Sequence, residues 1–142
     1  MKVKDIMSRE VVSLNADDTV GRAAELMRNH NIGSVPVCNE EKVIGIITDR
    51  DIAIRSVASG ENFNNQKVRD VMSSNPVCGE SVMSTDDAAR IMSERQIRRL
   101  PIVDNSKLVG MVSLGDLAVE PKLQSEAGDA LMEISESSSP EF

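Results

Sequence analysis

Residues 45–52 have the sequence GIITDRDI, and residues 110–117 repeat its pattern as GMVSLGDL. With this offset of 65 residues, positions 3–55 align with positions 68–120 without a gap, and 14 of the 53 aligned pairs are identical. The hydrophobic pattern between the identities repeats as well. A fixed-period repeat of this length predicts two copies of one structural unit.

Each copy predicts the order strand, helix, strand, strand, helix. In the first copy, residues 11–14 form a short extended piece, and apolar side chains three and four residues apart predict a helix over residues 19–29. Two apolar runs rich in β-branched residues, at 34–38 and 43–47, predict a buried hairpin. A second helix is expected from Asp49 to about residue 58, and its counterpart begins at Leu114.

The repeat predicts the organisation of the chain. The first copy covers residues 1–58, a polar loop covers 59–66, and the second copy covers 67–120. In the remaining segment, 121–142, helical spacing predicts an acidic amphipathic helix that packs on the body or on a second subunit, and a disordered tail from Glu136. The apolar residues of this helix are Leu123, Ala127, Ala130, Leu131 and Ile134.

Composition limits the classes of function. The 142 residues include 40% apolar and 27% charged residues, which is typical of a soluble globular protein. The net charge of −7 argues against a nucleic-acid partner, and the two aromatic residues, Phe63 and Phe142, are too few for base stacking. Because no apolar run approaches the roughly 18 residues of a membrane span, we expect a cytoplasmic protein without a membrane partner.

Catalytic and metal chemistry have little support in the sequence. No nucleophile with an adjacent base is apparent, so we expect no enzymatic activity and no catalytic residue. His30 is expected near a helix end, where it complements the helix dipole. Cys38 and Cys78 are too far apart for a C-x-x-C pair and are expected to be reduced thiols, so neither a metal nor a bound cofactor is expected.

Several motifs recur in the same order in both copies. VKDIMS at 3–8 returns as VRDVMS at 68–73, and IGSVPV at 32–37 has its counterpart in IRRLPIVD at 97–104. Together with the two glycine-containing stretches quoted above, they resemble the CBS (cystathionine β-synthase) domain, over residues 1 to about 120.

The resemblance implies an α+β fold in which two βαββα repeats pack as a pseudo-twofold module. It also implies a homodimer, usually a flat disc, and an adenosyl ligand such as AMP, ADP, ATP or S-adenosylmethionine in one or two clefts between the repeats. The chain is similar to small stand-alone bacterial members of the family, which have no catalytic domain attached.

The candidate site chemistry lies in the G-x-x-T-x-x-D pattern at 45–51 and in G-x-x-S-x-x-D at 110–116. A carboxylate can accept both vicinal hydroxyls of a ribose, a hydroxyl can donate to a phosphate, and a helix N-terminus favours an anion. The same spacing is typical of a helix capping box, which needs no ligand. The glycine three residues before each hydroxyl would let a ligand approach the strand, and this favours binding.

An arginine pair distinguishes the two copies. Arg98 and Arg99 stand where the first copy has Gly33 and Ser34. Arginine forks match phosphate oxygens, although a solvated basic turn is the alternative interpretation. We therefore expect the cleft containing these arginines to prefer phosphorylated ligands.

By resemblance, each cleft combines residues of both repeats. One would contain Ser113, Asp116, Arg98 and Arg99 with Met7, Val12, Ile32 and Gly33. The other would contain Thr48 and Asp51 with Gly33, Ser34, Met72, Val77 and Ile97, and only Arg50 would add positive charge there, opposed by Asp49.

These expectations describe a non-catalytic regulatory or sensor module. Ligand binding would bridge and close the two repeats and change the shape offered to a protein partner that the sequence does not identify. The helices would form the interface of a homodimer. The alternative is a dimerisation or adaptor module with no physiological ligand.

Overall fold

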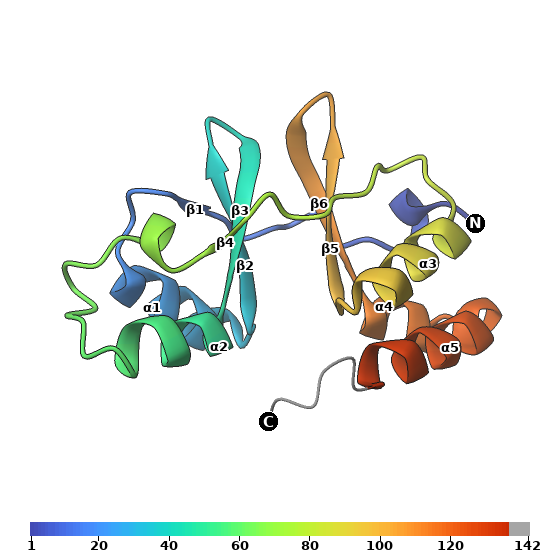
Figure 1. The fold of residues 1–142 in the computed structure, drawn as a ribbon. Coiled ribbons are helices and arrows are strands. Elements are labelled where there is room, and N and C mark those ends of the chain that lie inside the picture. Colours follow the sequence, from blue (N-terminus) through green and yellow to red (C-terminus); the bar gives the residue numbers. More distant parts are fainter. Residues whose placement is uncertain (137–142) are drawn as a thin grey trace. The chain divides into compact units, whose positions relative to one another are not determined.

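The computed structural model of the protein describes residues 1–136, and the chain forms two compact units (Figure 1). The N-terminal unit comprises residues 12–76 and 106–108. The C-terminal unit comprises residues 1–11, 77–105 and 109–136. Both units contain helices and strands, so the α+β class is confirmed.

The N-terminal unit is built on a four-stranded sheet with the order β1-β2-β3-β4. Strand β1 runs parallel to β2, and the β2–β3 and β3–β4 pairs are antiparallel. Its elements are β1 (Leu14–Asn15), α1 (Val20–His30), β2 (Ser34–Asn39), β3 (Lys42–Thr48), α2 (Asp49–Ile52), a π-helical turn (Ala53–Val57), a 3₁₀ turn (Val68–Asp70) and β4 (Ser73–Ser74).

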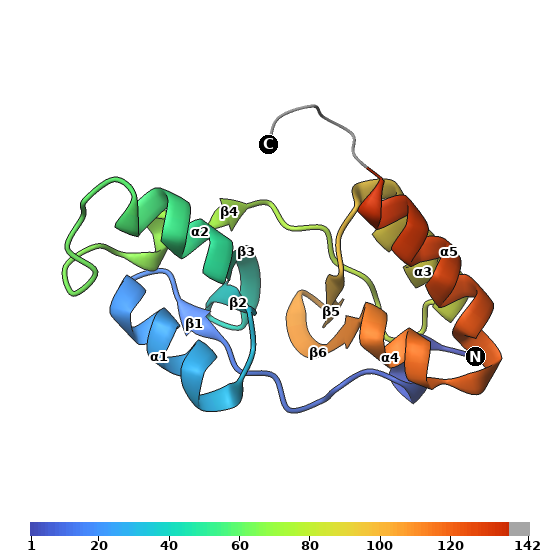
Figure 2. The ribbon, with the colours of Figure 1, turned by 90° about the horizontal axis from the view of Figure 1, so that it is seen from below.

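The C-terminal unit has a hairpin and a cluster of helices. The hairpin joins β5 and β6, and α5 lies along α3 and α4 (Figures 1 and 2). The elements are a 3₁₀ turn (Val3–Asp5), α3 (Thr85–Arg95), β5 (Arg99–Asp104), β6 (Lys107–Ser113), α4 (Leu114–Val119), a second 3₁₀ turn (Pro121–Leu123) and α5 (Gln124–Ser135).

The segments that open the two sequence repeats pack in the opposite units. Val3 and Met7 belong to the buried core of the C-terminal unit, where the Val3 N–H donates to the carbonyl oxygen of Met83 at 2.9 Å. Val68 belongs to the buried core of the N-terminal unit, where its N–H donates to the carbonyl oxygen of Asp18 at 2.8 Å. Each compact unit is therefore completed by a segment from the other repeat.

Side-chain and loop caps position the long helices. The Thr19 hydroxyl accepts a hydrogen bond from the Arg22 N–H at 3.1 Å at the start of α1. The first two N–H groups of α1, those of Val20 and Gly21, donate to carbonyl oxygens of Gln66 and Phe63 in the loop between the repeats. This loop therefore belongs to the N-terminal unit by its hydrogen bonds.

Most predicted elements are confirmed. The helix expected over 19–29 is α1, and the expected hairpin is β2–β3. The extended piece expected at 11–14 was wrong in extent, because only residues 14–15 pair with a neighbouring strand. The second helix begins at Asp49 as expected, but it changes to π-helical geometry from Ala53.

The appended helix α5 packs on its own unit. Leu123 and Ala127 are buried in the same core as Leu117 of α4, so packing on the body is confirmed. Beyond Glu136 the predicted tail lies outside the described residues. Within residues 1–136 no helix has the length and apolar character needed to cross a membrane.

Candidate functional site

In the N-terminal unit, Thr48 and Asp51 form a reciprocal capping box where β3 ends and α2 begins. The Thr48 N–H donates to Oδ2 of Asp51 at 3.0 Å, and the Asp51 N–H donates to the Thr48 hydroxyl at 3.0 Å. The Asp51 side chain is only 14% exposed. The strand end and the helix start therefore hold this carboxylate in a fixed position.

The C-terminal unit repeats this geometry. The Ser113 N–H donates to Oδ2 of Asp116 at 2.8 Å, and the Asp116 N–H donates to the Ser113 hydroxyl at 3.1 Å. The capping interpretation of the motif is thus correct in both units. It is also compatible with ligand binding, because capping uses one carboxylate oxygen and leaves each hydroxyl proton available to donate.

In each unit, a backbone hydrogen bond joins the residue just before the hairpin to the first residue of the helix that follows the hairpin. The Asp49 N–H donates to the carbonyl oxygen of Gly33 at 2.9 Å, and the Leu114 N–H donates to that of Arg98 at 2.8 Å. Ser34 pairs with Thr48 across β2 and β3. The N-terminal unit therefore gathers Gly33, Ser34, Thr48 and Asp51, and the C-terminal unit gathers Arg98, Arg99, Ser113 and Asp116.

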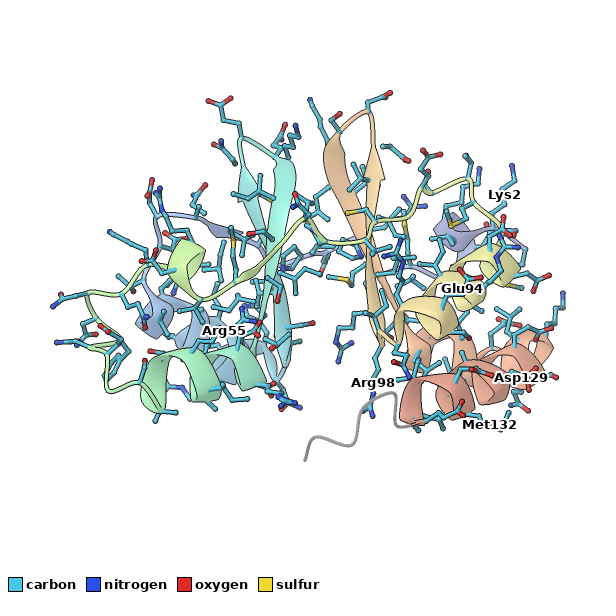
Figure 3. All side chains as sticks on the ribbon, viewed as in Figure 1. Lys2, Arg55, Glu94, Arg98, Asp129 and Met132 are labelled. Carbon is cyan, nitrogen blue, oxygen red and sulfur yellow. The ribbon has the colours of Figure 1, made fainter. Side chains whose placement is uncertain are left out.

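Three polar side chains in these clusters are candidates for contact with a ligand. The Ser34 hydroxyl oxygen is buried and has no hydrogen-bond partner within residues 1–136. Arg98 and Arg99 are exposed and form no salt bridge in the described part of the chain, and Figure 3 shows Arg98 extended away from its backbone. Both the hydroxyl and the guanidinium groups can bind phosphate or sugar oxygens.

The apolar candidates lie at the edges of the two cores. Met7, Val77 and Ile97 pack in or against the core of the C-terminal unit. Val12, Ile32 and Met72 pack against the core of the N-terminal unit. That these residues combine across the repeats into two clefts stays a prediction.

The expected role of the motif glycines was wrong. A Cβ atom at Gly45 would lie 2.5 Å from Sδ of Met72 and 2.9 Å from the carbonyl oxygen of Ser73. At Gly110 it would lie 2.6 Å from Sδ of Met7. Glycine is therefore required because the protein's own incoming segment packs on the strand, and not because a ligand approaches it there.

Sequence reasoning missed Arg55. Its Nη1 atom donates to the carbonyl oxygens of Val71 at 2.9 Å and Met72 at 3.3 Å, and lies 3.9 Å from Oδ1 of Asp51. The expectation that only Arg50 adds positive charge near Asp51 was thus wrong. The available signal was the i, i+4 spacing from Asp51 to Arg55, which places the two side chains on one helix face.

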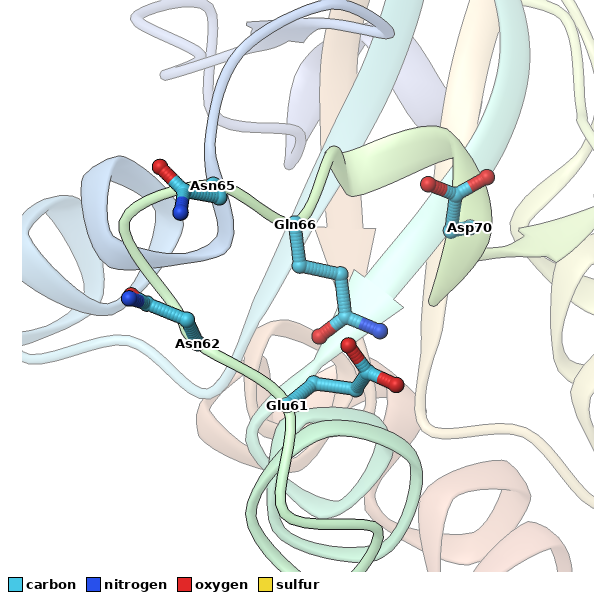
Figure 4. Close-up of a pocket in the computed structure, with 5 residues that line it drawn as sticks. All are labelled: Glu61, Asn62, Asn65, Gln66 and Asp70. Carbon is cyan, nitrogen blue, oxygen red and sulfur yellow. The ribbon is translucent and has the colours of Figure 1, made fainter.

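A polar hollow lies elsewhere in the N-terminal unit. It has a volume of about 510 Å³ and is lined by Glu61, Asn62, Asn65, Gln66 and Asp70, from the loop between the repeats and the turn after it (Figure 4). None of the predicted site residues lines it.

The family model for the CBS domain matches residues 3–57 and 68–121. The chain belongs to the CBS domain family. The CBS domain-containing protein YhcV of Bacillus subtilis is 46% identical over 133 residues, which cover 94% of each protein. The resemblance inferred from the repeated motifs is therefore confirmed.

Solved structures of CBS proteins have the same fold. The CBS domain pair of protein MJ0100, in complex with 5′-methylthioadenosine and S-adenosyl-L-methionine, is 29% identical with a TM-score of 0.74, covering 83% of this chain and 97% of that one. Hypoxic Response Protein I, with two coordinated zinc ions, is 30% identical with a TM-score of 0.78, covering 84% and 98%.

Within residues 1–136 no three His, Cys, Asp or Glu side chains gather as they would around a metal ion. Cys38 is buried in β2, and burial raises the pKa of the Cys78 thiol above its ordinary value.

Proposed function

We propose that this CBS protein is a non-catalytic regulatory module that binds an adenosyl ligand in clefts between its two repeats. The candidate ligands are AMP, ADP, ATP and S-adenosylmethionine. A related CBS pair binds S-adenosyl-L-methionine and 5′-methylthioadenosine, and this supports the adenosyl class without selecting the member.

The observation that carries the proposal is the spare oxygen of each capping aspartate. In both units Oδ2 accepts the backbone N–H, which fixes the carboxylate, and within residues 1–136 Oδ1 accepts no backbone hydrogen bond. For Asp116, Oδ1 accepts no hydrogen bond from any described residue. A fixed carboxylate with free acceptor capacity suits the vicinal hydroxyls of a ribose.

The two sites differ in charge. Arg98 and Arg99 stand beside Ser113 and Asp116, and the equivalent positions beside Asp51 are uncharged. Because guanidinium groups form strong charge-assisted bonds with phosphate, we assign phosphorylated ligands to the Ser113/Asp116 cleft. The Thr48/Asp51 cleft takes ligands of lower charge, with the Ser34 hydroxyl as an added polar contact.

Regulation follows from clefts shared between repeats. A ligand that contacts both repeats favours the closed arrangement, since only contacts that differ between two states shift their populations. A protein partner then recognises the closed form. The module acts as a homodimer through its helices.

A second candidate function is a dimerisation or adaptor module without a physiological ligand. It is favoured by the complete capping boxes, which satisfy Thr48, Ser113 and their helix ends without any ligand. Exposed apolar side chains on the helices also suit a purely assembling role.

Differential scanning calorimetry with each of the four candidate ligands separates these functions. A ligand present at about 100 times its dissociation constant adds about 2.7 kcal/mol to the free energy of unfolding. Asp116→Asn keeps an oxygen for the cap but removes the second acceptor, so it should reduce this gain. Ser84→Ala, which removes the cap of α3 away from the predicted site, should leave the gain intact. No stabilisation of the unmodified protein by any of the four ligands would favour the adaptor.

A further inference from the structure

The Arg55 guanidinium lies next to the carboxylate of Asp51 in the N-terminal unit. Its Nη1 atom is 3.9 Å from Oδ1 of Asp51. Because an N–H···O hydrogen bond extends to roughly 3.2 Å, the two groups attract each other by charge without a direct hydrogen bond. The Asp51 side chain is 14% exposed and the Arg55 side chain is 49% exposed, so both groups remain accessible to a ligand.

Arg55 has hydrogen-bond donors that the protein does not use. A guanidinium group carries N–H donors on Nε, Nη1 and Nη2. Nη1 donates to the carbonyl oxygens of Val71 and Met72, which fixes the guanidinium beside the turn that ends at Asp70. Within residues 1–136 the Nη2 and Nε atoms of Arg55 donate to no acceptor. A fixed guanidinium therefore presents unused donors next to the carboxylate.

The second repeat lacks this arrangement. Glu120 stands at the position equivalent to Arg55, and its side chain accepts a hydrogen bond from the Lys122 N–H. Helix α4 contains no arginine, and the two arginines beside Asp116 come from the start of the hairpin. A guanidinium one helical turn beyond the capping aspartate is therefore a property of the N-terminal unit.

A carboxylate oxygen beside an unused N–H donor selects a chemical group that both donates and accepts. A hydroxyl has this property, because its proton can go to Oδ1 of Asp51 while its oxygen accepts from Nη2 or Nε of Arg55. Hydrogen bonds of about 2.8 Å on each side let one hydroxyl oxygen bridge two groups at this separation. Asp51 would repel a second anion, and Arg55 would repel a cation.

We propose that Arg55 is a specificity-determining contact of the Thr48/Asp51 site, where it donates to a ribose hydroxyl whose proton Asp51 accepts. This inference rests on the proposed function and names the part of the adenosyl ligand that the N-terminal site recognises. A ligand without that hydroxyl loses bonds to two charged groups at once. The site therefore selects an intact ribose over a deoxyribose.

Titration calorimetry with adenosine, 2′-deoxyadenosine and 3′-deoxyadenosine tests this contact. The probes carry no phosphate and so suit the Thr48/Asp51 site, and Asp116→Ala removes the carboxylate of the other proposed site. The Asp116→Ala protein should bind adenosine at least about tenfold more tightly than the analogue that lacks the contacted hydroxyl. Equal affinity for the three probes would overturn the proposal.

Adding Arg55→Met to the Asp116→Ala protein separates the ligand contact from the structural role of Arg55. Methionine favours a helix and has no donor, so the preference for adenosine should fall at least about fivefold, to the part that Asp51 provides by itself. Loss of the bonds to Val71 and Met72 should weaken all three probes alike, which leaves their ratio unchanged. Arg55→Gln, whose uncharged side chain is shorter, is a second variant with the same expectation.

Arg28→Met is the matched control, because it removes an exposed arginine from the last turn of α1. It should leave the preference for adenosine unchanged. A folded Arg55→Met protein that keeps the full preference would overturn the contact, and so would an equal fall in the Arg28→Met protein.

The proposed function and the Arg55 contact fail in different ways. If the unmodified protein binds none of AMP, ADP, ATP and S-adenosylmethionine, both are contradicted. If the unmodified protein binds one of these ligands but the Asp116→Ala protein binds no adenosine, the adenosyl proposal stands and the Arg55 contact is overturned.

Discussion

Arg55 Nη1 lies 2.9 Å from the carbonyl oxygen of Val71, and this bond connects the turn after α2 to the segment that leads into β4. The same atom lies 3.9 Å from Oδ1 of Asp51. One guanidinium therefore links the proposed ribose acceptor to the segment that carries Met72. Glu120 stands at the equivalent position of the second repeat, so only the N-terminal unit has this connection.

Replacing Arg55 with Gln should destabilise the N-terminal unit by about 1 kcal/mol, the usual net value of a hydrogen bond at a partly exposed site. Backbone amides at residues 71–75 should exchange hydrogen faster, whereas those of β5 and β6 should not change. Arg28→Gln, on the exposed last turn of α1, is the control. Equal exchange rates in the two variants would show that Arg55 does not hold this segment.

The carboxylates of the two sites should not contribute equally to nucleotide affinity. Asp116→Ala should reduce ATP affinity roughly tenfold to over a hundredfold, or about 1.5–3 kcal/mol, because it removes a charged acceptor. Asp51→Ala should cost less. Titration calorimetry of both variants measures the difference, and equal losses, or a larger loss for Asp51→Ala with AMP, would contradict the assignment.

Arg99→Ala should weaken ATP and ADP more than adenosine, since the lost contact is to phosphate and not to sugar. Arg28→Ala, distant in sequence from both motifs, provides a matched loss of one positive charge. Titration calorimetry of both variants with the three ligands measures the affinities. If Arg99→Ala lowers the affinity for all three ligands equally, Arg99 does not bind phosphate.

Gly45→Ala should destabilise the fold because its methyl group would lie 2.5 Å from Sδ of Met72 and 2.9 Å from the carbonyl oxygen of Ser73. Overpacking of this kind costs about 1–3 kcal/mol. Gly128→Ala is the matched control, and its open surroundings should let it stabilise α5 by up to about 1 kcal/mol. Urea unfolding of both variants measures the two opposite shifts.

Two hydrogen bonds from Ser81 to the Asp104 carboxylate should make the stability of the fold depend on pH in the acidic range. The Ser81 hydroxyl donates to Oδ2 and its N–H donates to Oδ1 at 3.1 Å, and these bonds lower the pKa of Asp104 from its ordinary value of 3.8. Below pH 3.8 the unfolded chain binds a proton at Asp104 more readily than the folded protein does. The stabilisation by the Ser81 hydrogen bonds is therefore fully present above pH 3.8 and declines as the pH falls below that value.

The difference in unfolding free energy between the unmodified protein and Asp104→Asn should therefore shrink as pH is lowered from 5 to below 3.8. Urea unfolding at several pH values measures it. Glu94→Gln, at an exposed carboxylate of α3, controls for general charge effects. A difference that is independent of pH would show that Ser81 does not stabilise the ionised form.

The sequence by itself determined the architecture of each repeat, because the signals involved are local. Apolar periodicity located α1 and the β2–β3 hairpin, and the hydroxyl–x–x–aspartate spacing located the two capping boxes. Both depend on residues within a few positions of one another. Because these local patterns recur after 65 residues, the sequence also indicated the family and the residues of the candidate sites.

Only the tertiary structure decided which unit receives each opening segment. The bonds from Val3 to Met83 and from Val68 to Asp18 join residues far apart in sequence, and the local pattern of VKDIMS is the same whichever core it enters. For the same reason the sequence misassigned Gly45 to a ligand and overlooked Arg55. The contacts of both residues are with Met72 and its neighbours, and those contacts exist only once the second repeat's opening segment has packed on the first repeat's strand and helix.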